Sequence, residues 1–278
     1  EAAPPAAAER PAEGGLAAEE AEGTPLRTLR IVAVSDTHGF EASLAPEDVP
    51  EGDLLVHCGD FCLDGPDERE AGLERFDAWL AEVAERRFGG QPPLVVRGNH
   101  DASVGASFLR PGGDGYDTFP RSGALFFGRW PVALNLLDGA LNVSVVPWAQ
   151  KSQMPLNLRI PGSPDLLLSH VPPKLILDCC SHGQRAGSWA LRRAVAELRR
   201  KPRAWLFGHV HEAFGAARVR LADQDVFTWN PGPRPQAKRP RAVLCVNVAM
   251  ANGGRAARLV RPPSVLELGA GGAPARCA

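Results

Sequence analysis

Five short polar motifs each follow directly after an apolar stretch, and their residue types are those that bind metal ions in proteins. The motifs are Ser35-Asp36-Thr37-His38, Gly59-Asp60, Gly98-Asn99-His100-Asp101, Ser169-His170 and Gly208-His209-Val210-His211. The apolar stretches before them span residues 29–34, 54–56, 94–96, 166–168 and 204–207. Aspartate, asparagine and histidine usually occupy exposed or helix-cap positions, so this recurrent placement needs a cause. We expect the apolar stretches to be strands that bring the motifs together at one catalytic edge of a sheet.

The motifs contain enough side chains to bind two ions. Asp36 and His38 lie two residues apart, so in an extended segment they project to the same side and can bind one ion together. Histidine combined with carboxylate and amide oxygens suits Mn, Fe or Zn, and a carboxylate such as Asp60 can bridge two ions. Two ions need about seven or eight ligands, which leaves open positions for water and substrate. The candidate ligands are Asp36, His38, Asp60, Asn99, His170, His209 and His211, with the bridging residue counted twice.

Such a centre would hydrolyse phosphoesters. Two metal ions about 3.5 to 4 Å apart bind the oxygens of a phosphate, lower the pKa of a bridging water and orient it for in-line attack. His100, next to the candidate ligand Asn99, is predicted to act on the leaving group, by donating a proton or by neutralising the developing charge. Asp101 is predicted to hold the other ring nitrogen of His100.

The five motifs, in this order, resemble those of the calcineurin-like metallophosphoesterases, whose pattern is Asp-x-His, Gly-Asp, Gly-Asn-His-Asp/Glu, His and Gly-His-x-His. The likeness is greatest to the class III cyclic-nucleotide phosphodiesterases and the brain metallophosphoesterase-domain proteins. It runs through His57-Cys58-Gly59-Asp60-Phe61, Phe76-Asp77-Ala78-Trp79-Leu80, Pro147-Trp148, His170-Val171-Pro172-Pro173 and Phe207-Gly208-His209-Val210-His211-Glu212, within residues 29–268. Two departures concern the fit of the substrate: Val145-Val146 stands before Pro147-Trp148, and residues 230–241 look like an inserted loop.

This resemblance implies an α/β fold of four layers, with two mixed β-sheets stacked on each other and helices on their outer faces (αββα). It also implies a division of the ligands between the two ions. The first ion would be held by Asp36, His38, Asp60 and His211, and the second by Asp60, Asn99, His170 and His209.

The periodicity of apolar residues predicts two helices among short strands. Leu73, Phe76, Leu80 and Val83 form one stripe, which should lie on a sheet and end near Gly89. A second stripe runs from Leu191 to Leu198; Ser188 is its predicted N-cap, and it is expected to stop at Lys201-Pro202. Further strands are predicted at residues 124–127, 142–146, 226–229, 243–248 and 265–268.

Composition sets the limits of these expectations. We expect one metallophosphoesterase domain at residues 27–268, between an Ala/Glu/Pro-rich tail at residues 1–26 and a Gly/Ala/Pro-rich tail at residues 269–278, both disordered. The 31 basic and 32 acidic side chains give a net charge of -1, which disfavours extended nucleic acid as a substrate. No apolar run is long enough to span a bilayer, and the six cysteines show no disulfide or zinc-finger spacing. A cytoplasmic location is the resulting expectation.

Three functions remain open from the sequence. The first is a dinuclear metallophosphodiesterase for small phosphoesters, with cyclic nucleotides favoured by the resemblance. The second is a catalytically weak nucleotide-binding or scaffolding protein with the same fold, and the third is a phosphomonoesterase or nuclease with the same metal core. Outside the ligand set, we expect His57 to be a buried scaffold residue and His182 to be solvated, and Trp148 is a candidate for stacking on a base. The sequence does not indicate the oligomeric state.

Overall fold

The computed structural model describes residues 27–62, 69–105, 107–149, 157–221, 242–269 and 275–277. The predicted N-terminal tail, the predicted strand at residues 226–229 and the predicted loop at residues 230–241 lie outside the described residues.

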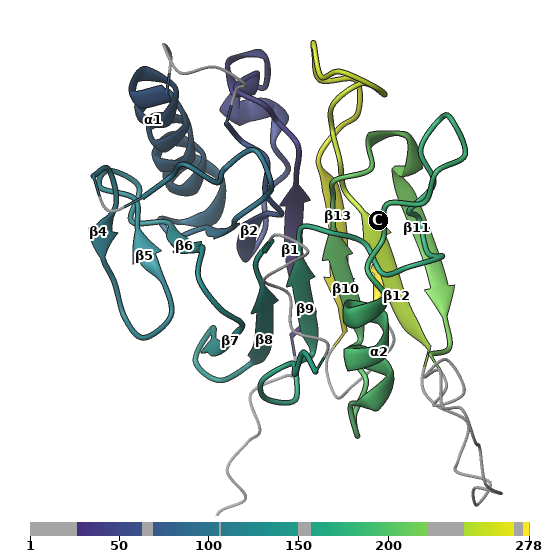
Figure 1. Ribbon diagram of the computed structural model, residues 1–278. Coiled ribbons are helices and arrows are strands. Elements are labelled where there is room, and N and C mark those ends of the chain that lie inside the picture. The colour runs from purple at the N-terminus through teal and green to yellow at the C-terminus, as the bar shows by residue number, and fades with distance from the viewer. Residues whose placement is uncertain are drawn as a thin grey trace, which may run out of the picture.

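Two β-sheets are stacked face to face (Figure 1). The first has the strand order β14-β13-β1-β2-β3-β6-β5-β4, and the second has the order β11-β12-β10-β9-β8-β7. The strands of the first sheet are β1 (Leu29–Val34), β2 (Leu54–His57), β3 (Leu94–Val96), β4 (Arg110–Pro111), β5 (Asp117–Thr118), β6 (Leu125–Phe127), β13 (Ser264–Leu268) and β14 (Arg276–Cys277). Those of the second are β7 (Val132–Leu136), β8 (Leu141–Val146), β9 (Leu166–Ser169), β10 (Ala204–Phe207), β11 (Gly215–Val219) and β12 (Val243–Asn247). Both sheets are mixed, as expected.

The centre of each sheet is parallel. In the first sheet β1, β2, β3 and β6 run in one direction, and in the second β8, β9, β10 and β12 do so. The antiparallel partners β13 and β11 lie beside these parallel groups. Because parallel strands end at the same edge, the segments after β1, β2 and β3 emerge together, as do those after β9 and β10. All five polar motifs lie at these strand ends.

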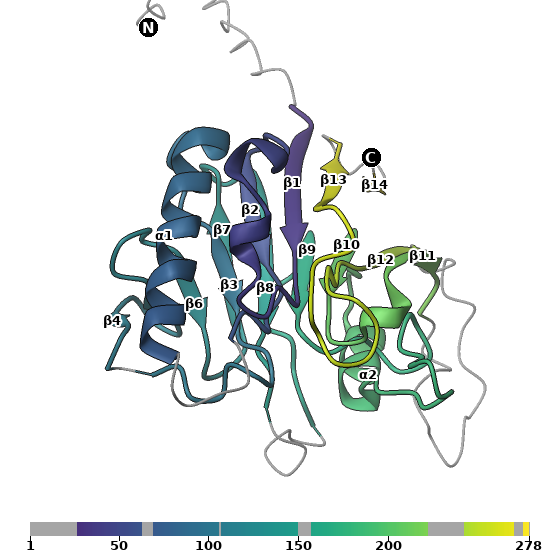
Figure 2. The same cartoon turned by 90° about the horizontal axis from the view of Figure 1, so that it is seen from above.

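The apolar residues form three clusters that separate four layers. The central cluster lies between the sheets and contains Ile31 and Leu54 of the first sheet with Leu166 and Leu206 of the second. A second cluster packs helix α1 (Arg69–Phe88) on the outer face of the first sheet, and a third packs helix α2 (Trp189–Glu197) on the outer face of the second. Figure 2 shows α1 beside β2 and β6, and α2 beside β10 and β12. The predicted αββα arrangement is therefore confirmed.

Both predicted helices form, but the second ends earlier than expected. Helix α1 ends at Phe88, before Gly89 and Gly90, which both adopt positive φ. In α2 the Ser188 side chain accepts a hydrogen bond from the backbone N–H of Leu191, as an N-cap does. Its chain leaves helical geometry at Leu198 rather than at residue 201. The Lys201 ammonium instead donates to two carbonyls at this end, which satisfies helix acceptors without a further turn.

Part of the predicted C-terminal tail is ordered, contrary to expectation. Arg276 and Cys277 form β14, an antiparallel partner of β13, and Ala275 is buried in the core between the sheets. The unpaired edge of β13 offers hydrogen-bonding groups to any chain that can reach it, which outweighs the poor strand propensity of this composition. The other tail residues, 270–274 and 278, lie outside the described part of the chain.

The six cysteines carry free thiols. In the parts of the chain that the structure describes, no helix is both long enough and apolar enough to cross a membrane.

Candidate metal centre

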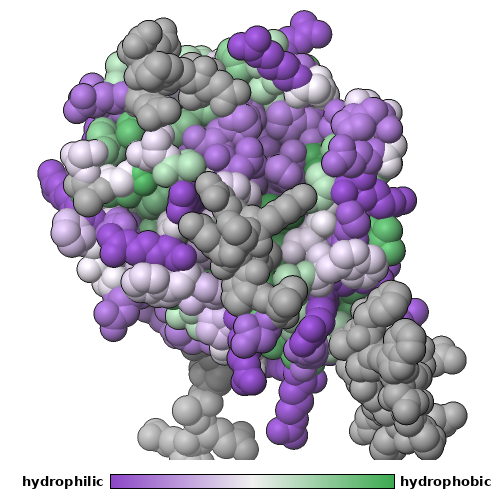
Figure 3. Space-filling view, viewed as in Figure 1, coloured by the Kyte–Doolittle hydropathy of each residue, from purple (hydrophilic) through white to green (hydrophobic). Residues whose placement is uncertain are grey.

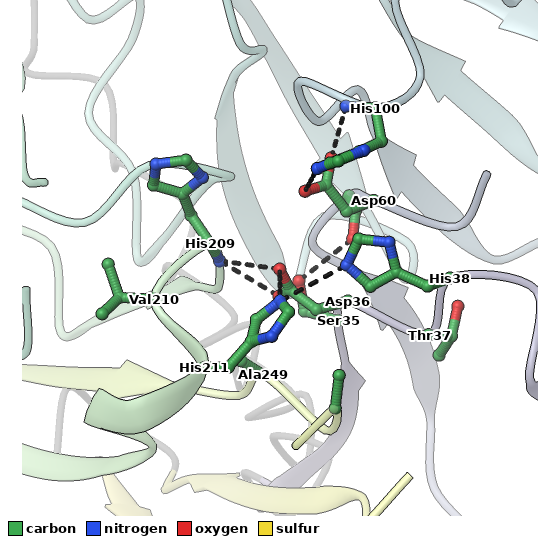
Figure 4. Close-up of polar contacts among 12 residues, drawn as sticks. Ser35, Asp36, Thr37, His38, Asp60, His100, His209, Val210, His211 and Ala249 are labelled. Carbon is green, nitrogen blue, oxygen red and sulfur yellow. Dashed lines mark hydrogen bonds and ion pairs between the residues drawn. The ribbon is translucent and has the colours of Figure 1, made fainter. Parts of the chain in front are cut away.

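The five motifs converge where the two sheets meet. Asp36, Asp60 and Asn99 follow β1, β2 and β3 of the first sheet, whereas His170 and His209 follow β9 and β10 of the second. Figure 4 shows Asp36 between the imidazoles of His38 and His211, with the backbone of His209 on its other side. The sequence therefore predicted correctly that these residues gather at one edge.

Four of the candidate ligands lie on strained backbone. Asp36, His38, Asp60 and His209 have φ values of 56°, 48°, 59° and 69°, in the left-handed region that costs a non-glycine residue roughly 1 to 3 kcal/mol. Direct backbone hydrogen bonds hold the first two loops against each other: the N–H of Asp36 donates to Gly59 O at 2.9 Å, and that of His38 donates to Asp60 O at 3.0 Å. Such strain is found where a structure must aim a functional side chain.

One group of donor atoms consists of Asp36, His38 and His211, whose ligand atoms all lie within 4.8 Å of one another. His211 Nε2 is 3.2 Å from Asp36 Oδ1 and 3.3 Å from His38 Nε2. The other ring nitrogen of His211 is 2.9 Å from the carbonyl oxygen of Asn252, to which its N–H donates. This hydrogen bond leaves the Nε2 lone pair directed at the group, as in histidines that bind metals.

A second group consists of Asp60, His170 and His209, again with ligand atoms within 4.8 Å. His170 Nε2 lies 3.2 Å from Asp60 Oδ2 and 3.0 Å from the Asn99 amide oxygen. His170 Nδ1 is 2.9 Å from Cys58 O, so its N–H donates there and Nε2 faces the group. Asn99 therefore lies beside this second set, to which the resemblance assigns it.

Asp60 lies between the two groups. Besides the second group, it shares a 4.8 Å set with His38 and His100, so its carboxylate reaches the neighbourhood of both ions that the sequence predicts. The side chain is only 2% exposed. Gly98 touches it closely: a Cβ at this glycine would lie 2.1 Å from Asp60 Oδ1, which explains why no larger residue could stand there.

The ionisable groups of the centre are mutually coupled. Burial opposes the charged form of Asp60, but the charge of His170 outweighs it and lowers the pKa of this carboxyl. Burial likewise opposes a charge on His170, yet Asp60 raises the pKa of that imidazole to about 9. Burial lowers the pKa of His209 to about 4. Metal ligation requires the neutral imidazole, so an ion that binds here must displace the proton of His170.

The residues fit the metal ions that the sequence predicts. Carboxylates, an amide oxygen and imidazole nitrogens converge in two buried groups, and hydrogen bonds on the far side of two imidazoles direct lone pairs inward. This mixed oxygen and nitrogen donor set suits Mn, Fe or Zn. In the described geometry the seven predicted ligands are neighbours, and Asp60 belongs to two of the donor sets.

His100 stands beside the two groups at the cavity wall. Its backbone N–H donates to Asp60 Oδ1 at 2.9 Å, and its ring Nε2 is 3.9 Å from Asp60 Oδ2. The side chain is 30% exposed, so a substrate can reach it. This position is suitable for the predicted action on a leaving group.

Asp101 has a different role from the predicted one. Its buried carboxylate accepts four backbone hydrogen bonds, from Gly98, Asp60, Phe61 and Cys62, at 2.7 to 3.1 Å. These donors occupy both oxygens, so Asp101 ties the loop after β3 to the loop after β2 rather than serving as a dedicated partner of the His100 ring. The Gly-Asn-His-Asp motif alone does not predict these hydrogen bonds, because three of the four donors, Asp60, Phe61 and Cys62, belong to the distant loop after β2.

A cavity of about 310 Å³ opens onto the centre. One wall consists of Asp60, Asn99, His100, His209 and His211, and the other of Cys180, Ser181, His182, Ala186, Glu212 and Gly254. In the view of Figure 3, hydrophilic side chains gather in the upper middle of the surface, toward which the arrows of β1 and β9 point in Figure 1. The cavity is of the size that small-molecule sites have.

Three residues of the second wall, Cys180, Ser181 and His182, lie in a hairpin that sequence reasoning missed. Buried Asp178 accepts hydrogen bonds from the backbone N–H groups of Leu175 and Gly187 and from the Arg185 guanidinium. Cys180 and Gln184 are also hydrogen-bonded, so residues 179–185 form a tight turn. His182 is exposed, as expected, and it also lines the cavity, with Nε2 3.0 Å from Gln184 Oε1. The one available signal was the turn-forming Ser-His-Gly at residues 181–183.

Trp148 stands against Arg97, whose guanidinium carbon lies 5.7 Å from the centre of the indole ring. It is not among the cavity-lining residues, so its candidate role in base stacking finds no support in this geometry.

Comparison with known proteins agrees with the residues. The model of the calcineurin-like phosphoesterase family matches residues 29–213. Human metallophosphoesterase domain-containing protein 1 is 30% identical over 215 residues, which cover 67% of this chain and 61% of that protein. A protein of Emericella nidulans named "Probable rhamnogalacturonate lyase C" is 30% identical over 198 residues, 67% of this chain but 17% of its own length. The chain thus spans less than two thirds of the length of each of these two relatives.

A solved structure of a metallophosphoesterase from Sphaerobacter thermophilus is similar over 87% of this chain and 84% of that chain, at 16% identity and a TM-score of 0.36. The match to the family model covers the strands from β1 to β10 and all seven candidate ligands. The resemblance of the motifs, including the likeness to metallophosphoesterase-domain proteins, is therefore confirmed, and this chain belongs to the calcineurin-like phosphoesterase family.

Proposed function

We propose that the protein is a dinuclear metal-dependent phosphodiesterase for small substrates, with cyclic nucleotides as the substrate class to test first. One observation carries the proposal: the Asp60 carboxylate shares one set of donor atoms with His170 and His209 and another with His38, which itself belongs to the first group. A shared carboxylate is the feature that separates a two-metal site from two unrelated single sites. When bound, the two ions would supply Lewis-acid activation of a water nucleophile and of the phosphate.

The residues of the chain would divide the remaining work. Asp36, His38 and His211 would hold one ion, and Asn99, His170 and His209 the other, with Asp60 shared between them. His100 would donate a proton to the leaving oxygen, because its ring stands at the cavity wall beside Asp60 and is accessible to substrate. The hairpin at residues 179–185 would limit the size of the group attached to the phosphate.

Two features support a small substrate. The cavity of about 310 Å³ is closed on one side by the hairpin wall, and the net charge of -1 provides no excess of cations for a long polyanion. We accordingly propose small phosphoesters as the partners of this protein, without extended nucleic acid.

The test is an assay of the purified protein loaded with Mn²⁺. Hydrolysis of bis(p-nitrophenyl) phosphate, p-nitrophenyl phosphate and 3′,5′-cyclic AMP would be compared, with Asp60→Asn as the inactive control. The proposal predicts turnover of the two diesters and weaker turnover of the monoester. Preference for the monoester would support a phosphomonoesterase, and tight metal binding without turnover of any ester would support a binding protein with the same fold.

A further inference from the structure

A buried chain of hydrogen bonds lies behind the metal centre and joins its first two loops. The N–H of Gly59 donates to His57 Nδ1 at 3.1 Å, and His57 Nε2 lies 2.9 Å from the Thr37 hydroxyl oxygen. The Thr37 hydroxyl in turn donates to the Glu41 carboxylate. His57 and Thr37 are fully buried, and Glu41 is 4% exposed. None of the three belongs to the predicted ligand set.

The direction of each hydrogen bond follows from chemistry. A backbone N–H can only donate, so His57 Nδ1 must accept from Gly59 and the ring proton must sit on Nε2. That N–H donates a hydrogen bond to Thr37 Oγ1, and the Thr37 hydroxyl donates its own hydrogen bond to the Glu41 carboxylate. Every member of the chain is satisfied in this one arrangement, so the network specifies a single geometry.

Two further features hold the ring of His57 in place. It meets the rings of Phe61 and Phe76 edge to face, at centroid distances of 5.8 and 5.3 Å. Burial lowers the pKa of His57 to about 3, so the ring stays neutral, with its proton on Nε2, throughout the range in which proteins are usually folded. The bridge from Gly59 to Thr37 is therefore permanent rather than switched by pH.

The network ends on both ligand loops. Thr37 stands between Asp36 and His38, and Gly59 directly precedes Asp60. All three ligands lie on left-handed backbone, which relaxes unless its surroundings hold it. The hydroxyl of Thr37 and the ring of His57 join these strained segments from behind, on the side away from the donor atoms.

We propose that His57, Thr37 and Glu41 are positioning residues that preset the separation between the Asp36-x-His38 pair and Asp60, and so the affinity of the shared site for two ions. An apolar trio such as Phe, Val and Leu would fill the same volume without the desolvation cost of three polar side chains. The inference rests on the metal centre of the proposed function and is independent of the reaction performed there.

The experiment compares Thr37→Val with Thr37→Ser in the otherwise unchanged full-length protein. Valine matches the shape of threonine but can neither accept from His57 nor donate to Glu41, whereas serine keeps the hydroxyl. Mn²⁺ affinity and stoichiometry would be measured by isothermal titration calorimetry on metal-stripped protein. Partners that orient metal ligands are typically worth about 10- to 100-fold in metal affinity. We expect a loss of that size for Thr37→Val, and affinity close to the original for Thr37→Ser.

A second pair of variants tests the other end of the chain and covers the case in which Thr37→Val does not fold. Glu41→Gln keeps an oxygen that accepts from Thr37, and Glu41→Leu removes it at similar volume. The inference predicts weaker Mn²⁺ binding for Glu41→Leu than for Glu41→Gln. Equal affinity of the two members of each pair would overturn it, because packing alone would then explain the three residues.

The outcome does not depend on finding a substrate. If the unaltered protein binds two Mn²⁺ ions but hydrolyses no ester, the proposed function fails while the affinity differences still test the positioning role. If it hydrolyses diesters and the variants bind Mn²⁺ as it does, the proposed function stands and the positioning role is refuted.

Discussion

The two sheets contribute different chemistry to the same site. The first sheet supplies the oxygen donors, Asp36, Asp60 and Asn99, together with His38, whereas the second supplies only the imidazoles of His170, His209 and His211. Close contacts cross between the sheets, with Asp36 against His211 and both Asn99 and Asp60 against His170. Neither sheet contains a complete site, so the metal centre is a property of their packing.

The two halves also differ in what their loops contact. In the first sheet, Asp101 takes four backbone hydrogen bonds, and the loops after β1 and β2 bond directly to each other. In the second sheet, His170 extends directly from β9, and the chain that follows it builds the hairpin wall of the cavity. This difference indicates that the first sheet sets the spacing of the ligands and that the second sheet shapes the space for substrate.

The largest effect on metal binding and turnover is expected from loss of Asp60, and loss of His209, which belongs to only one group, should have a smaller effect on metal binding. Asp60→Ala removes the carboxylate that belongs to the second group and also approaches His38 of the first, so we expect it to abolish binding of both ions, whereas His209→Ala should leave the Asp36 group able to bind one. Each ion supplies several kcal/mol to the reaction, so turnover should fall by about 1,000-fold or more in Asp60→Ala. Metal content after dialysis, measured by inductively coupled plasma mass spectrometry, distinguishes the two variants. Retention of two ions by Asp60→Ala would refute its bridging position.

A narrower effect, on turnover but not on metal content, is expected at His100, which stands at the centre without belonging to the ligand set. His100→Ala should lower kcat by about 100- to 10,000-fold, because a proton donor is lost, and should leave the bound metal unchanged. His182→Ala, on the opposite wall of the same cavity, is the matched control and should alter KM more than kcat. The prediction fails if His100→Ala loses metal in proportion to its loss of activity.

The clamping role of Asp101 predicts a loss of both stability and metal affinity. Asp101→Ala leaves four backbone N–H groups without their acceptor, and we expect the free energy of unfolding to fall by on the order of 3 kcal/mol. Asp77 provides a control, because this buried carboxylate accepts from the N–H groups of Arg121 and Ser122, away from the site. Urea unfolding should show a lower free energy of unfolding for both Asp101→Ala and Asp77→Ala. Calorimetry should show weaker Mn²⁺ binding only for Asp101→Ala.

The smallest effect concerns pH. Burial raises the pKa of Glu41 from its model-compound value of 4.5 to about 7, although the hydrogen bond from Thr37 acts against the rise. A carboxyl with a raised pKa in the folded protein stabilises it most below pH 4.5, and this contribution is lost as the pH rises through 7. The unaltered protein should therefore lose about 1 to 3 kcal/mol between pH 5 and pH 8 relative to Glu41→Gln, which cannot titrate at this position. Urea unfolding of the two proteins at both pH values measures the difference; parallel pH profiles would show that Glu41 does not titrate in this range.

Much of the architecture could be predicted because the signals were local. Runs such as residues 31–34 and 204–207 are continuously apolar, as buried parallel strands are, and the stripe from Leu73 to Val83 has helical spacing. Polar residues directly after such strands must emerge at a common edge, so the seven candidate ligands could be identified before their positions were known. The early end of α2 was missed because it depends on the Lys201 side chain, which donates to carbonyls of the last turn from beyond the helix. The pairing of β14 was missed because it depends on the open edge of β13, which a short window of sequence does not reveal.

The amino-acid sequence by itself determined which residues could bind metal and at which ends of which strands they stand, because strand periodicity and residue type are encoded within a few positions. Only the tertiary structure decided that Asp60 shares donor sets with His38 on one side and with His170 and His209 on the other, that Asp101 is a clamp and that Glu41 is buried beneath Thr37. Those roles depend on contacts between segments that are remote in the chain. The packing of the two sheets brings such segments to within a few ångströms, and local sequence does not record that approach.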